Sequence, residues 1–385
     1  MKTLRLLLCT LLILPVLLLP CRAFALEPLR DGEIGIAAPS AILMEKVTGQ
    51  VLYEKNADQR FLPASVTKVM TLLLIVEDIE AGKLALDDVV TASPRAASFG
   101  GSCVYLEEGE QMSVHEMLKC ITVASANDCA VAMAEHVSGT EELFVVRMNA
   151  KAEELGLKNT HFTNCTGLFE DPDHYTSAYD VALMSRELLS YPFVRQFTGL
   201  WTDSIRGGAF GLTNTNRLVR FYPGCTGLKT GFTSRAMFCL AASAMREDTE
   251  YIAVILHGET SQKRFDAART LLDYAFANYA LLRPDESVLP RVRVRLGTAD
   301  SVGVRCGDSG LIVADKRLRS RLETAAELPG EIQAPVVEGQ RLGTLRLTAD
   351  GEVISETPLV AEADVARKGP GRIFMELAGA LCGEK

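Results

Sequence analysis

The sequence predicts an α+β fold, in which an antiparallel sheet packs with a helical cluster and is followed by a smaller, mostly β domain. Strand-like segments flank a mainly helical middle between residues 38 and 281, and strands and helices do not alternate regularly. Beyond residue 282, apolar residues alternate with basic ones at 292–296 and with Arg346 and Thr348 at 345–348, as in short strands. The 385 residues, 48% of them apolar, suffice for more than one domain and a large core.

The first 25 residues have the features of a secretory signal peptide. A positively charged start is followed by an apolar run and by the small-residue cleavage site Ala23-Phe24-Ala25. We therefore expect the mature protein to be exported to the cell envelope. A membrane anchor is the alternative, but the run is short for a span and is broken by Pro15 and Pro20. Pro20 also argues against lipoprotein processing at Cys21.

The composition disfavours nucleic-acid binding and metal chemistry. The formal net charge is −9, and removal of residues 1–25, with three basic and no acidic residues, would make it −12. Such an acidic chain is a poor partner for nucleic acid. The ten cysteines include no C-x-x-C pair. Cys120, Cys129 and Cys239 are predicted to be small buried hydrophobes, and we expect no catalytic cysteine. The five histidines form no H-E-x-x-H cluster, so no metal and no cofactor are expected.

Local patterns predict the order of the elements in the first domain. A hairpin is expected at residues 40–45 and 50–54 around a Val-Thr-Gly turn, and a strongly apolar helix follows from Ser65. Ser113 and Glu116 form a capping box in front of another helix. The remaining elements are predicted to be helices at 128–137, 141–155 and 177–189, strands at 228–232, 236–245 and 251–257, and a helix at 265–279.

These observations divide the chain into a signal peptide at 1–25, a main domain at 26–281, a β domain at 282–363 and a tail at 364–385. The tail predicts a short amphipathic helix preceded by basic residues. It is either an interfacial membrane anchor or a helix packed on the protein, and the sequence leaves both open. The apolar residues that share one side of this helix are Ile373, Phe374, Leu377, Ala378 and Leu381.

Ser65 and Lys68 share one face at the head of the apolar helix, because they are three residues apart. A serine hydroxyl needs a base to become a nucleophile, and lysine is a poor base in water because it is charged. Burial lowers the pKa of a lysine, so Lys68 could serve as that base. The ordinary alternative is an N-cap serine followed by a first-turn lysine, and S-x-x-K alone is common by chance.

Two further fragments accompany this pair. Ser125-Ala126-Asn127 lies between two predicted helices and would otherwise be an N-cap. Lys229-Thr230-Gly231 opens a predicted strand, where a glycine is unfavourable unless something approaches the backbone, such as a substrate peptide laid along the edge. Each fragment is weak alone. Their order on helix, loop and strand matches the motif set of class A β-lactamases and penicillin-binding proteins.

With these motifs, the chain resembles the serine-type D-alanyl-D-alanine carboxypeptidases of the peptidase S11 family, which are low-molecular-mass penicillin-binding proteins. The resemblance extends to "PASVTKVMTLLL", "ASANDCAVAMAEHVSG", "GLKTGFTSRAMFCLAASA" and "TSQKRFDAARTLLDYAF". It is strong over residues 38–281 and looser in the β domain and the tail. It implies peptidoglycan stem peptides as substrate and β-lactams as covalent inhibitors.

The resemblance also implies a role for each site residue. Ser65 would attack the D-Ala-D-Ala carbonyl, Lys68 would be its general base, and Ser125 would relay a proton to the leaving amine. The residues implied to bind the substrate or its oxyanion are Asn127, Lys229, Thr230, Gly231, Phe232 and the carboxylate-binding arginine, Arg264.

Three alternatives remain open from the sequence. Class A β-lactamases deacylate with a glutamate in E-x-x-L-N, and Glu170 is followed by Asp171-Pro172-Asp173 instead, which argues against a β-lactamase. An endopeptidase that cuts cross-links is harder to exclude. A non-catalytic penicillin-binding sensor is a rival from another class, although a decayed enzyme would be expected to lose some of the three motifs.

Overall fold

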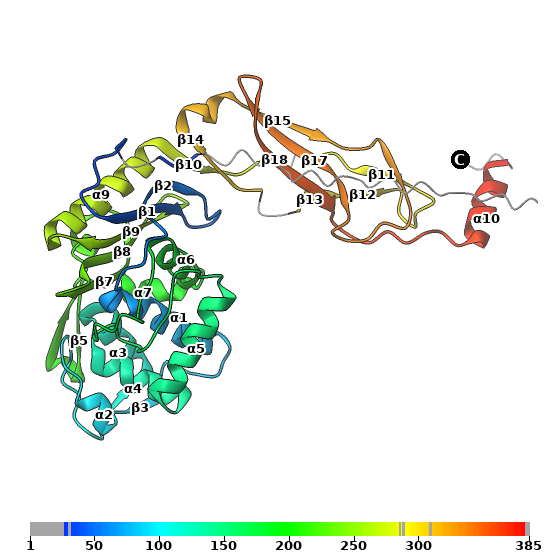
Figure 1. Cartoon of the computed structure of the whole chain (residues 1–385). Coiled ribbons are helices and arrows are strands. Elements are labelled where there is room, and N and C mark those ends of the chain that lie inside the picture. The colour runs from blue at the N-terminus through cyan, green and yellow to red at the C-terminus, as the bar shows by residue number, and fades with distance from the viewer. Residues whose placement is uncertain (1–26, 30–31, 285, 287–288, 308–309, 382–385) are drawn as a thin grey trace, which may run out of the picture. The chain divides into compact units, whose positions relative to one another are not determined.

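The computed structural model describes residues 27–29, 32–284, 286, 289–307 and 310–381. The expected signal peptide lies outside the described residues. The described chain forms two compact units (Figure 1). The main unit comprises Leu26–Asp285 and Ser309–Arg321, and the β unit comprises Glu286–Asp308 and the chain from Leu322 onward. Ser309–Arg321 lies inside the predicted β domain but clusters with the main unit, because β14 (Ile312–Asp315) pairs with β10 (Tyr279–Leu282).

A five-stranded antiparallel sheet is the centre of the main unit. Its order is β2-β1-β9-β8-β7, so β7 is an edge strand. The predicted hairpin is confirmed, with Ala41 opposite Lys55. The mixed α+β architecture predicted from the sequence is confirmed as well. The bounds of the five strands are β1 (Ser40–Glu45), β2 (Val51–Lys55), β7 (Cys225–Thr233), β8 (Met237–Arg246) and β9 (Thr249–Gly258).

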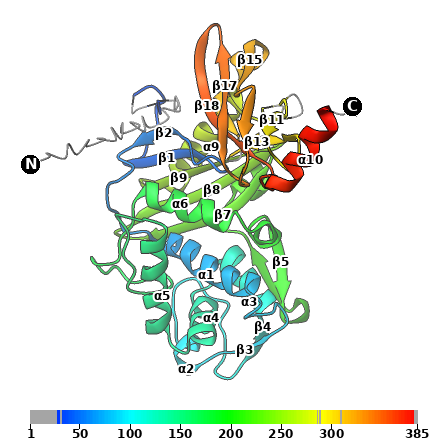
Figure 2. The same ribbon diagram turned by 90° about the vertical axis from the view of Figure 1, so that its right-hand side faces the viewer.

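The sheet is buried on both faces. Successive residues of each strand point to opposite sides and enter two different cores. On β9, Val254 joins the core formed with the helical cluster, and its neighbour Ala253 joins a second core with α9 (Ser261–Asn278). α9 therefore covers one face of the sheet, and α6 (Ala178–Leu188) with the helices beyond it covers the other (Figure 2). Burial on both faces explains why these strands are continuously apolar rather than alternating.

The remaining elements of the main unit are short or belong to the helical cluster. Ser113 accepts a hydrogen bond from the Glu116 N–H, as the predicted capping box requires. Two small two-stranded antiparallel sheets, β3–β4 and β5–β6, accompany the helices. The elements are α1 (Lys68–Glu80), β3 (Val89–Thr91), α2 (Pro94–Ala97), β4 (Gln111–Ser113), α3 (Val114–Lys119), α4 (Asn127–Ser138), α5 (Glu141–Glu154), α7 (Arg195–Thr198), β5 (Thr202–Ile205), β6 (Phe210–Thr213) and α8 (Leu218–Phe221).

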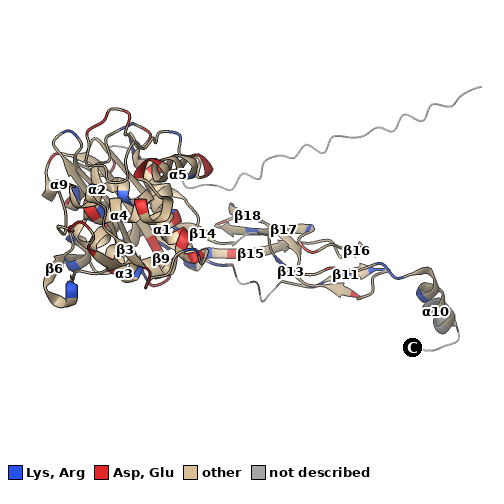
Figure 3. Ribbon diagram, turned by 90° about the horizontal axis from the view of Figure 1, so that it is seen from below, with Lys and Arg blue, Asp and Glu red and all other residues tan. Residues whose placement is uncertain are grey.

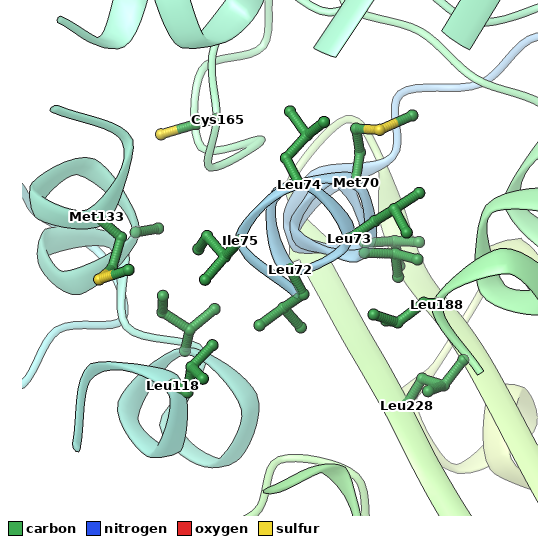
Figure 4. Packing of buried hydrophobic residues seen from close by; sticks show 14 of the residues in the cluster. Met70, Leu72, Leu73, Leu74, Ile75, Leu118, Met133, Cys165, Leu188 and Leu228 are labelled. Atoms are coloured by element: carbon green, nitrogen blue, oxygen red, sulfur yellow. The ribbon is translucent and has the colours of Figure 1, made fainter. Parts of the chain in front are cut away.

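α1 runs through the middle of the helical cluster. Figure 4 shows its leucine and isoleucine side chains pointing outward in several directions into neighbouring helices and the sheet. The predicted apolar helix is therefore confirmed, but its start differs from the prediction. Ser65 lies in a 3₁₀ turn, η1 (Ala64–Thr67), and the α-helix begins only at Lys68. Each fully buried leucine contributes about 1.5–3 kcal/mol, so this helix anchors the cluster.

The β unit contains two small sheets around a core of its own. One has the order β12-β11-β16, with β11 and β16 parallel, and the other has the antiparallel order β13-β18-β17-β15. Val294, Leu345 and Leu359 belong to its core. The strands are β11 (Val292–Arg295), β12 (Ser301–Val302), β13 (Val304–Cys306), β15 (Leu322–Glu327), β16 (Glu331–Gln333), β17 (Arg341–Ala349) and β18 (Glu352–Ala361).

The predicted tail helix is present as α10 (Pro370–Leu381). Figure 3 marks basic residues in blue where the chain enters this helix. Phe374 and Met375 on it are exposed, at 69% and 71%. Within the described ranges, no helix has both the length and the apolar character needed to cross a membrane.

Candidate active site

The two residues predicted to be nucleophile and base lie together at the start of α1. Lys68 is fully buried and its Nζ donates a hydrogen bond to Ser65 Oγ at 3.0 Å, while Ser65 itself is only half-buried. The 3₁₀ turn that carries Ser65 leads directly into the helix that carries Lys68. The reactive hydroxyl can therefore meet a ligand while the amine stays out of water.

Burial lowers the pKa of Lys68 from 10.5 to about 7, although the charges of Cys165, Cys103 and Asp128 oppose the shift. Besides Ser65, the amine donates to Asn127 Oδ1 at 2.5 Å and to the Thr166 carbonyl at 3.1 Å. These partners are neutral oxygens, so they orient the amine without a carboxylate that would hold it charged. Near pH 7 a large share of Lys68 is neutral and able to accept a proton.

A second lysine–serine pair faces the first. Lys229 Nζ donates to Ser125 Oγ at 2.8 Å and to its neighbouring carbonyl, that of Thr230, at 2.9 Å. Burial, followed by the charges of Lys68 and Arg264, lowers the pKa of Lys229 well below its usual value. Simultaneous protonation of Lys68 and Lys229 is therefore disfavoured.

Ser125 reaches this position through an unusual local backbone. The π-helical turn η2 (Cys120–Ala124) extends α3, and Ser125 ends it in the left-handed region, at φ 61°. Asn127 then opens α4. A single π-turn with a left-handed cap costs stability and is typical of functional sites. The sequence located this loop between two helices correctly, but its periodicity did not show the π-turn.

β7 forms the opposite wall. A Cβ added to Gly231 would lie 2.8 Å from the Pro63 carbonyl oxygen and 3.0 Å from Ser65 N, so only glycine allows this strand to approach the Ser65 turn. We expected something to approach this glycine, such as a substrate peptide, and in the structure the Ser65 turn is a close neighbour. Thr230, the residue before it, donates to Thr215 Oγ1 at 2.6 Å.

Phe232 and Arg264 lie beside this wall. Phe232 follows Gly231 on β7, and its ring, 55% exposed, stacks on Phe238 at 4.3 Å. Arg264 is buried, and its Nη1 donates to the carbonyls of Gly231 at 3.0 Å and Cys239 at 3.1 Å. Burial lowers the pKa of Arg264 to about 10. The arginine therefore supports β7 from behind, a contact that the motif gave no reason to expect.

Sequence reasoning missed the loops that close the site. The Asn127 amide donates to the Gly100 carbonyl at 2.8 Å, and its backbone N–H donates to Ser102 O at 2.7 Å. Gly167 has φ 71°, and a Cβ there would lie 1.9 Å from the Ala64 carbonyl oxygen. Glycines such as Gly100 and Gly167 were the only hint of these two loops in the sequence, because glycine often marks a close backbone approach.

His174 is a further residue that the sequence did not single out. It is buried, its Nδ1 accepts the Thr163 N–H at 3.0 Å, and its Nε2 lies 2.8 Å from Thr67 Oγ1. Because Nδ1 is an acceptor, Nε2 carries the proton and donates to Thr67. Burial lowers the pKa of His174 to about 4, so the ring is neutral at pH 7 and fixes the Ser65 turn to the 161–175 loop.

Glu170, the residue weighed as a β-lactamase-type base, has other partners. Its carboxylate accepts hydrogen bonds from Ser234 Oγ at 2.9 Å and Arg235 N at 2.8 Å, on the turn after β7. It is therefore a link between two loops. Among the described residues, no group of three or more His, Cys, Asp or Glu side chains is arranged to hold a metal ion.

Comparison with known proteins identifies the family. Residues 27–260 match the peptidase S11 family, described as D-alanyl-D-alanine carboxypeptidase, and residues 276–367 match the C-terminal domain of penicillin-binding protein 5. The chain is 44% identical over 346 residues to the D-alanyl-D-alanine carboxypeptidase DacF of Bacillus subtilis, covering 88% of this chain and 89% of that protein.

Solved structures agree with this match. Penicillin-binding protein 5 from Haemophilus influenzae superposes with a TM-score of 0.78 at 30% identity, covering 86% of this chain and 98% of that one. Penicillin-binding protein D2 from Listeria monocytogenes, solved in an ampicillin-bound form, gives a TM-score of 0.58 at 30% identity, over 63% of this chain and 98% of its own. The protein belongs to the peptidase S11 family of D-alanyl-D-alanine carboxypeptidases.

Proposed function

We propose that the protein hydrolyses the terminal D-Ala-D-Ala bond of peptidoglycan stem pentapeptides through an acyl-enzyme on Ser65. The observation that carries the proposal is the 3.0 Å contact between Ser65 Oγ and the fully buried amine of Lys68, with its pKa near 7. A half-buried serine beside a neutral amine is an activated nucleophile. The resemblance to carboxypeptidases supports the choice of substrate.

Acylation begins when neutral Lys68 takes the hydroxyl proton of Ser65 as Oγ attacks the carbonyl carbon of the penultimate D-alanine. The N–H groups of Ser65 and Phe232 would stabilise the negative charge on the carbonyl oxygen. The C–N bond then breaks, and the leaving D-alanine amine receives a proton from Ser125, whose hydroxyl is hydrogen-bonded to Lys229. Lys229 and Lys68 together resupply that proton, so the net transfer is from Ser65 to the amine.

Deacylation completes the cycle. Water attacks the Ser65 ester, Lys68 accepts the water proton, and the proton returns to Ser65 Oγ as the shortened peptide leaves. A β-lactam would acylate Ser65 in the same way, but its amine stays tethered to the acyl group and hinders the water. The relative from Listeria monocytogenes, solved in an ampicillin-bound form, supports β-lactam binding. Glu170, held by Ser234 and Arg235, is not placed in this step, which disfavours the β-lactamase alternative.

Four residues would bind the two ends of the scissile dipeptide. Asn127 would hydrogen-bond the substrate amide, and Lys229 with Thr230 would meet the terminal carboxylate. Arg264 would add positive charge for the carboxylate from behind β7, where its Nη1 donates to two backbone carbonyls and its Nη2 lies 3.5 Å from Ser261 Oγ. Gly231 and Phe232 would present the backbone of the edge strand, along which an extended peptide can lie.

The test is incubation of the mature protein with a stem pentapeptide ending in D-Ala-D-Ala, followed by assay of free D-alanine. Wild type should release D-alanine and be labelled by a fluorescent penicillin, and Ser65→Ala should do neither. Labelling of Ser65→Ala, or failure to label wild type, would overturn the serine-acylation proposal. Labelling of wild type without D-alanine release would point to the endopeptidase or sensor alternative.

We also propose export and peripheral membrane contact. Residues 1–25 would direct export, the main domain at 26–281 and the β domain at 282–363 would act in the cell envelope, and the tail at 364–385 would touch the outer face of the cytoplasmic membrane. The exposed Phe374 and Met375 of α10 and the basic residues before it support the tail's role. Liposome flotation should separate the full-length protein from a truncation after Ala366; equal behaviour would refute the anchor.

A further inference from the structure

A cavity of about 380 Å³ lies between α8 and α9 in the main unit, outside the site described above. This is the size range of small-ligand sites, roughly 300–1,000 Å³. In the described part of the chain, none of its lining side chains hydrogen-bonds to Ser65, Lys68 or Ser125. The lining residues are Arg217, Leu218, Phe221, Gln262, Phe265 and Arg269.

The rim of the cavity carries positive charge that the protein does not neutralise. Arg217 and Arg269 are exposed, and neither forms an ion pair or a side-chain hydrogen bond with any described residue. On the same helix as Arg269, Asp266 accepts a hydrogen bond from Gln262, and Asp273 accepts one from the Tyr222 hydroxyl. Two arginines without carboxylate partners are notable in a chain with a formal charge of −9. They fit an anionic group, because guanidinium binds carboxylates in a bidentate manner.

The floor and one side of the cavity are apolar. Leu218 and Phe265 are buried, at 1% and 4% exposure, whereas the ring of Phe221 is 58% exposed and lies edge-to-face on Trp201 at 5.9 Å. A concave site with apolar walls and a basic rim suits a short peptide with carboxylates and small apolar side chains better than a flat lipid surface. Stem peptides, which contain alanine and free carboxylates, have this chemistry.

Both walls of the cavity are attached to β7. Ahead of α8, Thr215 accepts a hydrogen bond from Thr230 at 2.6 Å, and Asn216 Nδ2 donates to the Gly227 carbonyl at 2.9 Å. On the other wall, Arg264 of α9 donates to the Gly231 carbonyl at 3.0 Å. The cavity therefore adjoins the strand along which the proposed substrate lies.

We propose that this cavity binds the carboxylate-bearing stem peptide adjacent to the one in the active site, so that the protein prefers cross-linked or neighbouring stem peptides to isolated ones. The inference rests on the proposed function. Arg217 and Arg269 bind the carboxylates, and the exposed ring of Phe221 contacts the alanine methyl groups. The active site cleaves one stem peptide while the cavity holds the other.

The experiment compares two substrates with the full mature chain. One is a monomeric pentapeptide ending in D-Ala-D-Ala, and the other is a cross-linked muropeptide dimer with the same ending. The test variant is Arg217→Ala combined with Arg269→Ala. The matched control is Arg220→Ala, which removes an exposed arginine of α8 that does not line the cavity. D-alanine release gives kcat and KM for each protein with each of the two substrates.

The double variant should raise KM for the dimer by about 10-fold, because two exposed charge contacts are each worth up to a factor of roughly five. KM for the monomer, and both constants of Arg220→Ala, should be unchanged. Added salt should bring the wild-type KM for the dimer towards that of the variant. Melting temperatures equal to wild type would show that the variant is folded.

Two results would overturn the inference. One is an unchanged KM for the dimer in the folded double variant, and the other is an equal rise for dimer and monomer. If the double variant also loses flotation with anionic phospholipid vesicles while its dimer KM stays unchanged, the cavity binds lipid headgroups and the peptide assignment is wrong. Failure of wild type to release D-alanine from the monomer would instead refute the proposed function.

Discussion

The pKa of Lys68 near 7 makes the rate of acylation depend on pH in a definite way. In the proposed mechanism the neutral amine is the base, so the second-order rate of penicillin acylation should follow the neutral fraction of Lys68. With a pKa of about 7, that fraction is about one tenth at pH 6 and about nine tenths at pH 8. The rate should therefore rise about 10-fold across this interval and flatten above it.

Lys68→Arg is the perturbation that isolates this effect. An arginine stays protonated at every accessible pH, so it cannot accept the Ser65 proton. Removing a general base costs about 10²–10⁴ in rate, and the residual rate should show no rise between pH 6 and pH 8. His174 does not contribute to the wild-type rise, because burial lowers its pKa to about 4.

The assay is time-resolved labelling of the mature protein by a fluorescent penicillin, in buffers of constant ionic strength from pH 5.5 to 9. Intact folding at each pH is checked by circular dichroism. A flat wild-type profile, or a rate that still rises steeply at pH 9 as expected for an ordinary lysine with a pKa of 10.5, would refute a buried neutral base. A Lys68→Arg profile that kept the rise with pH would assign the titration to another group.

Three more changes test other parts of the site. Asn127→Asp places a carboxylate where the amide oxygen lies 2.5 Å from Lys68, so it should raise the pKa of that lysine and move the acylation midpoint up by about one to three pH units. Gly231→Ala should force β7 away from the Ser65 turn. It should lower the free energy of unfolding by about 1–3 kcal/mol and also reduce penicillin labelling. Glu170→Gln should keep the rate of penicillin release within about 2-fold of the wild-type rate. If Glu170 were a β-lactamase-type base, the substitution would lower that rate about 10²-fold or more. The release rate is measured on protein that has been labelled beforehand.

The sequence predicted which residues meet at the centre of the site, because the motifs specify residue types in a fixed order. Ser65 and Lys68 lie within one turn of chain, and the apolar residues behind them predict burial of the amine. Ser125 and Lys229 are far apart in sequence, and only the recognised motif set connects them before the fold is known. The structure brings them within 2.8 Å, through a π-turn that no local pattern indicates.

The parts that the sequence did not predict depend on contacts between distant segments. The Thr166 carbonyl binds Lys68 only because the 161–175 loop folds back over α1, and a backbone carbonyl leaves no signature in the sequence. The sequence indicated that something approaches Gly231, but it did not show that the Ser65 turn is a close neighbour. In the β unit, the alternation at 292–296 predicted β11, whereas its parallel pairing with β16, nearly 40 residues away, is set by tertiary packing.

Stability and reactivity oppose each other at Lys68. The folded pKa of about 7 lies below the value of 10.5 expected for an exposed lysine, so between these two values the unfolded chain binds more protons and stability rises with pH. Below pH 7 the amine is protonated in both states, and its burial costs roughly 5 kcal/mol relative to high pH. Fully buried leucines contribute about 1.5–3 kcal/mol each, and α1 supplies several directly behind Lys68. The apolar run thus both lowers the pKa of the amine and offsets the stability lost by burying it.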